Sequence, residues 1–454
     1  MKRVSAAAFL AALLATATGA HAQSETDQKI SDLEKRVESL VAKEKAREAE
    51  EAKAKAAKGT TLRSVFDGGK IAWESADGAY RFRLVGRLQV DGAFFSGSEN
   101  RLSNGLTIRR GRIGWQARIA KDWTSEFEVD FAGNGVEVTD AFVGWEGVKG
   151  GLARAGNFKV PFGMDTMTSD NDIWFVEPAY VDAWSPGRRL GVGWKQGGRD
   201  FSAAADLYGQ AISVDTSGVD QGWGWGVRGT WAPLLVSDTR AIHVGLAAAA
   251  RRPDAATLGS GTLPPQAFLA SFSARPESTT VSRAKFLQTA TMAQVDWIRQ
   301  YGAELAGVWD AFAWQAEFQR TSVTRRAGFP TLADHDFSGW YAQVSWVVAG
   351  GKRKYDGPNG LVGRVVPSGR SGAFELAARY STMDLNDRAE TDPIVGGSAK
   401  NVTLGASWYP NLNFRFVLNW THVNNDEYAK PAIAYGGIPG DDFDEVQFRV
   451  QFAF

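Results

Sequence analysis

Arginine recurs at alternate positions in the first regular stretch of the chain. In residues 80–91, Arg81, Arg83 and Arg87 fall on one side of a two-residue period, and mainly apolar side chains fall on the other. Guanidinium groups carry forked donors that match phosphate and carboxylate oxygens, and they stay charged at any relevant pH. A period of two is the period of a β-strand. The pattern predicts a strand with one cationic face that could bind anionic oxygens.

A second arginine-rich stretch follows, with one slip in its alternation. Arg110, Arg112 and Arg118 share one side of the segment 105–119. The apolar positions before Arg109 would fall on that same side, whereas those after Arg110 fall on the other, so the alternation slips by one residue. One extra residue in the strand, a β-bulge at Arg109-Arg110, would let both arginines lean to the polar side. We therefore predict a bulge at this dipeptide.

Carboxylates share the predicted polar face on the third strand. Glu126, Glu128 and Asp130 alternate with large apolar side chains between residues 123 and 131. Cross-strand ion pairs between these carboxylates and the arginines would neutralise much of the cationic wall. Two interpretations stay open, since the arginines could contact solutes or could be ion-paired scaffolding.

The composition and the C-terminus favour a membrane barrel over a soluble sheet. The 454 residues hold 17 Trp, 26 Phe, 10 Tyr and 50 Gly but no cysteine, and the mean hydropathy is only -0.25. No apolar run after the N-terminal segment is long enough for a spanning helix. The last strand alternates up to a terminal Phe454, which is typical of the signal that outer-membrane assembly machinery recognises. We predict an all-β fold, a transmembrane antiparallel β-barrel with its apolar face toward lipid.

The N-terminal segments predict export and a helix. Residues 1–22 combine Lys2-Arg3, an apolar run at 6–14 and Ala20-His21-Ala22, which is the pattern of a cleaved secretory signal. Residues 23–58 predict a short α-helical coiled coil that joins identical subunits on the periplasmic side, with a solvated single helix as the alternative. Its seam consists of Ile30, Leu33, Val37 and Leu40. Residues 59–79 are a linker with a short hairpin, and 80–454 form the barrel.

The spacing of turns predicts about sixteen barrel strands, an even number, as single-chain bacterial barrels require. Their predicted starts lie near 80, 105, 123, 137, 150, 189, 200, 222, 241, 297, 311, 337, 371, 398, 411 and 443. The connection at about 161–188 is long and rich in aspartate and tryptophan, so we predict that it folds into the barrel. Short turns and long loops should alternate along the chain, because they lie at opposite ends of the barrel. The connection 350–372 is an exception, since it is long where a short turn is expected.

These motifs, taken together and in order, resemble the phosphate-selective porin O and P family. The matching runs are IRRGR at 108–112, KDW at 121–123, FEVDFAG at 127–133, DAF at 140–142, GNFKVPFG at 156–163 and SPGRRLG at 185–191. The resemblance implies a trimeric sixteen-stranded outer-membrane channel for small anions such as phosphate, narrowed by an inward loop. Our candidates for anion contact or pore lining are Arg81, Arg83, Arg87, Arg109, Arg110, Arg112, Arg118, Lys159, Arg188 and Arg189.

Three other functions remain open from the sequence. A weakly selective or sugar-type porin would use its aromatic side chains to guide neutral solutes. A barrel hydrolase would need a nucleophile with its base, but His243, His335 and His422 have no recognisable Ser or Asp motif, so we predict no enzyme, no cofactor and no metal. An envelope tether would bind peptidoglycan or periplasmic partners through the coiled coil. The expected surroundings are outer-membrane lipid and lipopolysaccharide, and a formal net charge of zero argues against nucleic acid.

Overall fold

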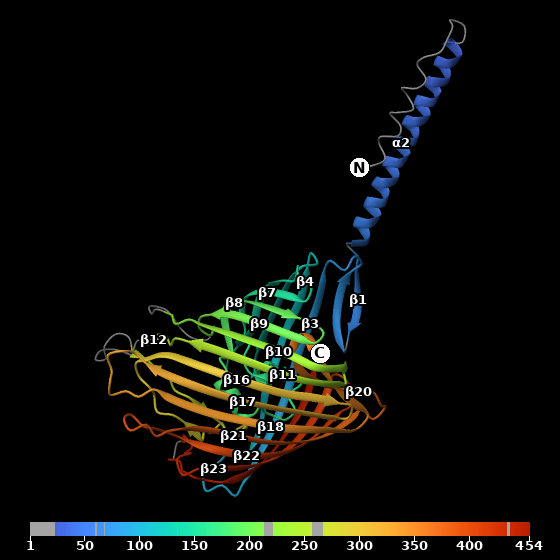
Figure 1. Ribbon diagram of the computed structural model, residues 1–454. Helices are drawn as coiled ribbons and strands as arrows, with labels where there is room; N and C mark the ends of the chain where they lie inside the picture. The colour runs from blue at the N-terminus through green and yellow to red at the C-terminus, as the bar shows by residue number, and fades with distance from the viewer. Residues whose placement is uncertain are drawn as a thin grey trace. The chain divides into compact units, whose positions relative to one another are not determined.

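The computed structural model describes residues 23–59, 61–67, 69–133, 135–212, 221–256, 267–433 and 436–454. The predicted export signal, residues 1–22, lies outside them. The described residues form a closed ring of antiparallel strands (Figure 1). The sixteen barrel strands are β3 (Arg81–Ser96), β4 (Gly105–Ile119), β5 (Trp123–Asp130), β6 (Glu137–Trp145), β7 (Gly151–Lys159), β8 (Arg188–Gly197), β9 (Phe201–Tyr208), β10 (Gly224–Ser237), β11 (Arg240–Arg251), β16 (Val295–Trp309), β17 (Phe312–Arg325), β18 (His335–Ala349), β21 (Ala373–Asp387), β22 (Ile394–Tyr409), β23 (Phe414–Asn425) and β24 (Phe443–Ala453).

Each of these strands pairs with its sequence neighbour, and the last strand closes the ring on the first. Strand β24 runs antiparallel to β3 from Asp444↔Ser96 to Ala453↔Arg87. Backbone hydrogen bonds of 3.0 Å in both directions between Gly86 and Phe454 continue the seam to the chain end. The prediction of an all-β barrel with about sixteen strands is confirmed.

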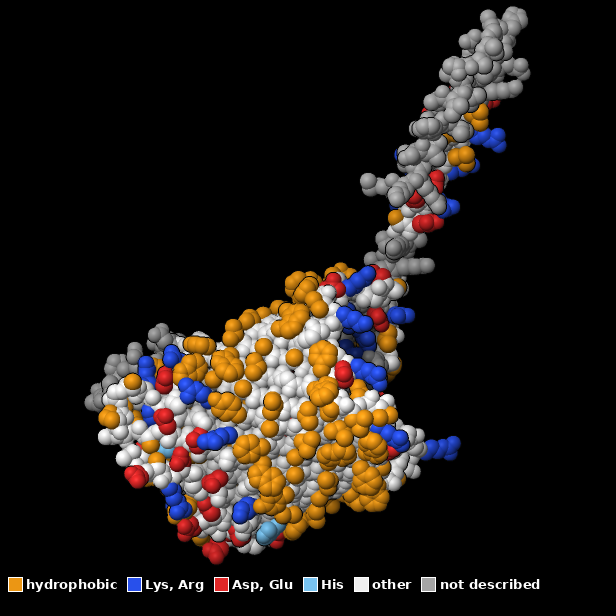
Figure 2. All heavy atoms as spheres, in the orientation of Figure 1, with side chains coloured by type: hydrophobic (Ala, Val, Ile, Leu, Met, Phe, Trp, Pro, Cys, Tyr) orange, Lys and Arg blue, Asp and Glu red, His pale blue; other side chains and the backbone are white. Residues whose placement is uncertain are grey.

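The alternation of side chains separates the outside of the barrel from its interior. Phe82 and Trp115 are 41% and 37% exposed on the outer face, whereas Gln89 and Asp91 are fully buried inside. Figure 2 shows hydrophobic side chains gathered over the outer wall on the face in view. Such an apolar wall around polar contents is the arrangement of a barrel in lipid.

The predicted bulge in the second barrel strand is confirmed. Gln89 of β3 pairs with Arg110 and Val90 pairs with Ile108, so Arg109 is the extra residue. Because the bulge restores the inward parity, Arg110 is buried inside the barrel and Arg109 also reaches a carboxylate of the interior.

The N-terminal part consists of α2 (Gln23–Gly59) and a hairpin of β1 (Leu62–Asp67) and β2 (Lys70–Ser75). Strand β2 pairs with the first residues of β3, for example Ala72 with Arg83. Three predicted seam residues of α2, Leu33, Val37 and Leu40, are 51–60% exposed, and the side chain of Ile30 lies outside the described part. Among the described residues, no helix has the length and apolar character needed to cross a membrane.

Two connections of the barrel run inward rather than over its rims. The connection from β7 to β8 holds α3 (Met164–Met167) and the 3-10 helix η1 (Tyr180–Trp184), and most of its apolar side chains are buried. The connection from β18 to β21 forms a hairpin of β19 (Gly351–Asp356), η2 (Gly357–Asn359) and β20 (Leu361–Pro367). The stretch between β11 and β16 contains only the short strands β12 (Ala255–Ala256), β13 (Ala267–Phe268), β14 (Ser273–Ala274) and β15 (Leu287–Gln288) among its described residues, none of them in the barrel sheet.

Candidate functional site

The loop 161–187 is fastened to the inner wall by side chains from distant strands. The Glu317 carboxylate on β17 accepts from the amide of Met164 at 3.1 Å. On β23, Arg415 donates to the carbonyls of Ile173 and Trp174 at 2.5 and 2.7 Å. The sequence therefore places polar inward side chains where the loop backbone needs partners.

The hairpin β19–β20 enters the barrel from the end with the short turns. The Arg228 guanidinium, which points inward from β10, donates to the carbonyls of Asn359 and Gly360 at the hairpin tip, at 3.1 and 2.8 Å. At the hairpin base, Arg353 pairs with Glu375 of β21 at 2.5 Å. The sequence identified this connection as too long but contained no local signal for its direction.

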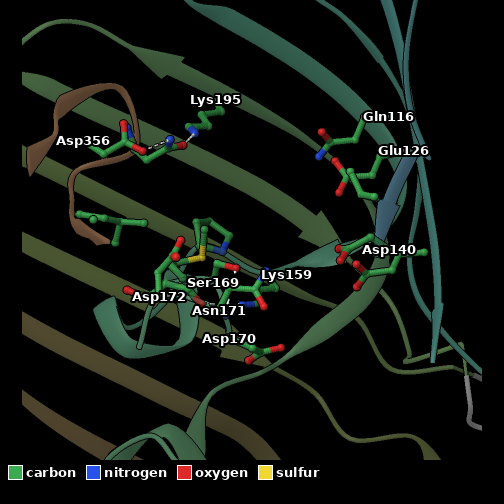
Figure 3. A pocket seen from close by; sticks show the side chains of 18 of the residues that line it. Gln116, Glu126, Asp140, Lys159, Ser169, Asp170, Asn171, Asp172, Lys195 and Asp356 are labelled. Carbon is green, nitrogen blue, oxygen red and sulfur yellow. Dashed lines mark hydrogen bonds between the residues drawn. The ribbon is translucent and has the colours of Figure 1, made fainter. Parts of the chain in front are cut away.

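Two cavities lie on either side of the loop. The first, of about 470 Å³, opens toward the short-turn end and is lined by β2 to β10, the loop and the hairpin tip (Figure 3). The second, of about 400 Å³, lies toward the long-loop end and is lined by Arg109, Arg110, the loop and residues 273–285. Asp170 lines both. This residue therefore lies between the two cavities.

Three arginines converge on Asp170. The distances to its Oδ2 are 3.6 Å from Nη1 of Arg87, 3.1 Å from Nε of Arg110 and 3.0 Å from Nη1 of Arg112. Burial alone would raise the pKa of this loop carboxyl, but Arg110, Lys159 and the two other arginines hold the pKa well below its ordinary value. Asp170 is therefore ionised at neutral pH and acts as an internal anion.

A carboxylate lies within ion-pair distance of Arg87, Arg109, Arg110, Arg112, Arg118 and Arg188. Besides the three arginines around Asp170, Arg109 contacts Glu177 at 2.7 Å and Arg188 contacts Asp140 at 2.7 Å. Arg118 lies 4.0 Å from Glu146, near the short-turn rim, and is 45% exposed. Of the predicted cross-strand pairs, Arg112 with Asp130 at 2.7 Å and Arg112 with Glu128 at 3.2 Å are formed.

The surroundings of Lys159, Arg189, Arg81 and Arg83 complete the set of predicted cations. Lys159 donates to the carbonyls of Thr166 and Thr168, at 2.6 and 3.1 Å, and lines the first cavity. Arg189 donates to the Pro186 carbonyl at 2.9 Å. Arg81 and Arg83 line a separate recess, where Arg83 donates to Gln116 at 3.3 Å.

Sequence reasoning missed the buried ion pairs of the later strands. The pairs are Arg449 with Asp91, Arg379 with Glu277, Arg353 with Glu375 and Arg228 with Glu304, each at 2.5–2.7 Å. Their signal was the same alternation that marked the first strands, since Gln447, Arg449 and Gln451 share the inward side of β24. It also missed Lys70 and Lys195, which line the first cavity.

His243, His335 and His422, the histidines within the described ranges, do not line either of the two cavities. His243 is buried, 2.9 Å from the Tyr355 hydroxyl and 3.3 Å from Glu304. His422 contacts Asp444 at 3.0 Å on the rim. Within the described ranges, no group of three or more His, Cys, Asp or Glu side chains is arranged to hold a metal ion.

Comparisons with known proteins agree with this geometry. The family described as phosphate-selective porin O and P matches residues 82–454. An uncharacterized protein of Caulobacter vibrioides is 29% identical over 77% of this chain and 71% of its own length, and Porin O of Pseudomonas aeruginosa is 23% identical over 85% and 91%. Among solved structures, an anion-selective porin from Comamonas acidovorans superposes with a TM-score of 0.50 at 14% identity, over 83% of this chain and all of its own. The last similarity concerns the fold alone.

Proposed function

The chain belongs to the phosphate-selective porin O and P family and is an outer-membrane channel protein, and on that premise we propose that small anions such as phosphate diffuse passively through its lumen. The observation that carries the proposal is the convergence of Arg87, Arg110 and Arg112 on one point beside the two cavities. Guanidinium donors that converge on a carboxylate would also suit the oxygens of a passing oxyanion.

Lysines along the first cavity support an anion preference. Lys159 and Lys195 have amide or carbonyl partners and no carboxylate ion pair among the described residues. Several moderate cationic sites in succession let an ion enter and leave, whereas one very tight site would block the flow. The remaining predicted cations, including Arg81 and Arg83 near the short-turn rim, would attract anions to the mouth.

The test is the reversal potential of the purified protein in a planar bilayer that separates two KCl concentrations. We expect a potential of the sign that indicates faster chloride than potassium. A potential of zero or of cation-selective sign would contradict the proposal. Measurements with phosphate and with larger organic anions would then give the size limit.

A weakly selective general porin is the second candidate, and one observation favours it. Glu126, Asp140 and Asp356 line the same cavity as the lysines, so the lining carries both signs of charge (Figure 3). Mixed lining charges weaken the preference for one sign. The same reversal potential separates the candidates, because a weakly selective pore would give a value near zero.

We extend the proposal to the assembly and its surroundings. The exposed apolar positions Leu33, Val37 and Leu40 on α2 support a coiled coil between identical subunits, because exposed seam positions need partner helices. We propose a homotrimer with this coil in the periplasm, where short turns of such barrels lie. Phe454 would serve barrel assembly, and the coil would also be free to contact peptidoglycan or periplasmic proteins.

A further inference from the structure

The carboxylate of Asp170 fills a position that is built for an anion. Its Oδ2 lies within 3.6 Å of guanidinium nitrogens from Arg87 on β3 and from Arg110 and Arg112 on β4. These side chains are only 5–15% exposed, so the contacts are shielded from bulk water. Three guanidinium groups held this close repel one another unless a negative charge lies between them. In this structure the loop supplies that charge.

Arg110 depends on Asp170 more than the other two arginines do. Arg112 also pairs with Glu128 and Asp130, and Arg87 also pairs with Glu128. Arg110 has no second carboxylate within ion-pair distance among the described residues, and it donates a hydrogen bond to the Gln89 amide oxygen at 2.8 Å. Loss of the Asp170 charge would therefore leave the Arg110 guanidinium, which lines the second cavity, without a compensating charge at ion-pair distance among the described residues.

The backbone of the loop is held at this point without help from the carboxylate. Gln89 donates to the carbonyl of Asp170 at 3.1 Å, and Gln451 donates to the carbonyl of Asn171 at 3.2 Å. The Asp172 amide donates to the Ser169 carbonyl at 2.8 Å and closes a local turn. A neutral side chain at position 170 would therefore leave the loop in place while the charge at its tip is gone.

We propose that Asp170 is a tethered counter-ion that occupies the oxyanion site of this channel and sets its selectivity. A permeating anion has to compete with a carboxylate whose local concentration is fixed by the loop, so the native channel binds phosphate weakly and passes anions with a modest preference. The inference rests on the proposed anion function, which it deepens by naming the residue that limits phosphate binding.

The test compares Asp170→Asn with wild type in planar bilayers. Two quantities are measured: the reversal potential in a KCl gradient, and the phosphate concentration that halves the chloride current. We expect a shift toward stronger anion selectivity, and phosphate block at a concentration lower by about tenfold or more, the effect of one charge-assisted hydrogen bond. Asp170→Glu keeps the negative charge, so phosphate should block its chloride current as weakly as that of wild type.

Asp140→Asn is the matched control. It removes the same charge from the wall of the same cavity but frees only Arg188 from a one-to-one pair. This variant should shift the reversal potential without tightening phosphate block. The double variant Asp170→Asn with Arg110→Gln should not show the tighter phosphate block of Asp170→Asn, because it lacks the Arg110 guanidinium that the single variant frees.

The outcomes distinguish this inference from the proposed function. Equal phosphate block in Asp170→Asn, Asp140→Asn and wild type, with an anion-selective wild type, overturns the role of Asp170 and leaves the anion channel intact. A wild type with a reversal potential of zero or of cation-selective sign overturns the proposed function itself. If Asp170→Asn does not fold, as judged by heat-modifiable migration in gels, Arg110→Gln decides: phosphate block weaker than that of wild type supports an oxyanion site there, and unchanged block overturns it.

Discussion

Arg449 and Asp91 face each other across the seam where the last barrel strand meets the first. Nε and Nη2 of Arg449 lie 2.8 and 2.7 Å from the two carboxylate oxygens of Asp91, and both side chains are fully buried. The two residues are also direct register partners of β24 and β3. This fork-to-fork pair therefore connects the first and last strands inside the closed barrel.

Breaking this pair should loosen the closure of the barrel. Arg449→Met leaves Asp91 buried without a cation and also removes a 3.2 Å contact with Glu177, so we expect a loss of about 3–5 kcal/mol in the free energy of unfolding. The measurement is urea unfolding in detergent. Asp91→Asn should lower the free energy of unfolding by less, because Arg449 still has its ion pair with Glu177. A larger loss in Asp91→Asn than in Arg449→Met would contradict this account.

Removal of the inward hairpin tip should widen the channel. A short glycine-serine turn in place of residues 354–363 takes away the segment that Arg228 holds on the inner wall and that lines the first cavity. Single-channel conductance in KCl should rise by about twofold or more, since the tip reduces an otherwise wide sixteen-stranded bore. Lys352→Gln, at the exposed base of the hairpin, is the control and should leave conductance unchanged. An unchanged conductance in the deletion would mean that the tip does not limit the flow.

Asp441 joins two connections at the long-loop end of the barrel. Its carboxylate accepts from Ser98 Oγ at 2.5 Å, from the Glu99 amide at 2.9 Å and from Asn100 Nδ2 at 2.6 Å. Burial would raise the pKa of Asp441, but these donors outweigh it and lower the pKa below 3.8. A lowered folded-state pKa stabilises the ionised form, so the contribution is present above pH 3.8 and is lost as the pH falls through the lower value.

Limited proteolysis of residues 97–104 is the measurement for this contact. Cleavage should stay slow and constant at pH values well above 3.8 and should increase only in stronger acid. Asp441→Asn should increase cleavage already at neutral pH. Asp442→Asn, at the neighbouring carboxylate that bonds Asn424 and Asn425, is the control and should leave this segment protected. Increased cleavage of wild type near pH 6 would contradict the assignment.

Deletion of residues 25–58 should separate assembly from transport. We expect the shortened protein to keep the single-channel conductance of wild type, because the permeation pathway lies within the barrel. Its oligomers should dissociate at lower temperature in native gels if Leu33, Val37 and Leu40 join subunits. Leu33→Asp with Leu40→Asp should reproduce that loss without shortening the chain. Unchanged oligomer stability in both variants would leave the helix as a spacer or a tether.

The sequence alone determined the alternation of inward and outward side chains and the bulge at Arg109. Both depend only on the geometry of an extended chain, in which neighbouring side chains point to opposite faces. The same local rule predicted the strand number, because glycine-rich and polar turns interrupt the period. It also indicated the inward side of β24, although its arginine was overlooked among the clearer first strands.

Ion pairs between residues far apart in the sequence were decided by the tertiary structure alone. Asp170 follows Arg112 by 58 positions, and Arg449 is 358 positions from Asp91. These two contacts depend on the path of a loop across the lumen and on the closure of the barrel. Neither can be predicted from the local alternation of side chains. The length of the connection 350–372 was visible in the sequence, but its inward course, with the tip bonded to Arg228 of β10, was not. The sequence therefore determined the barrel and its cationic face, and the fold determined how much of that charge is already occupied.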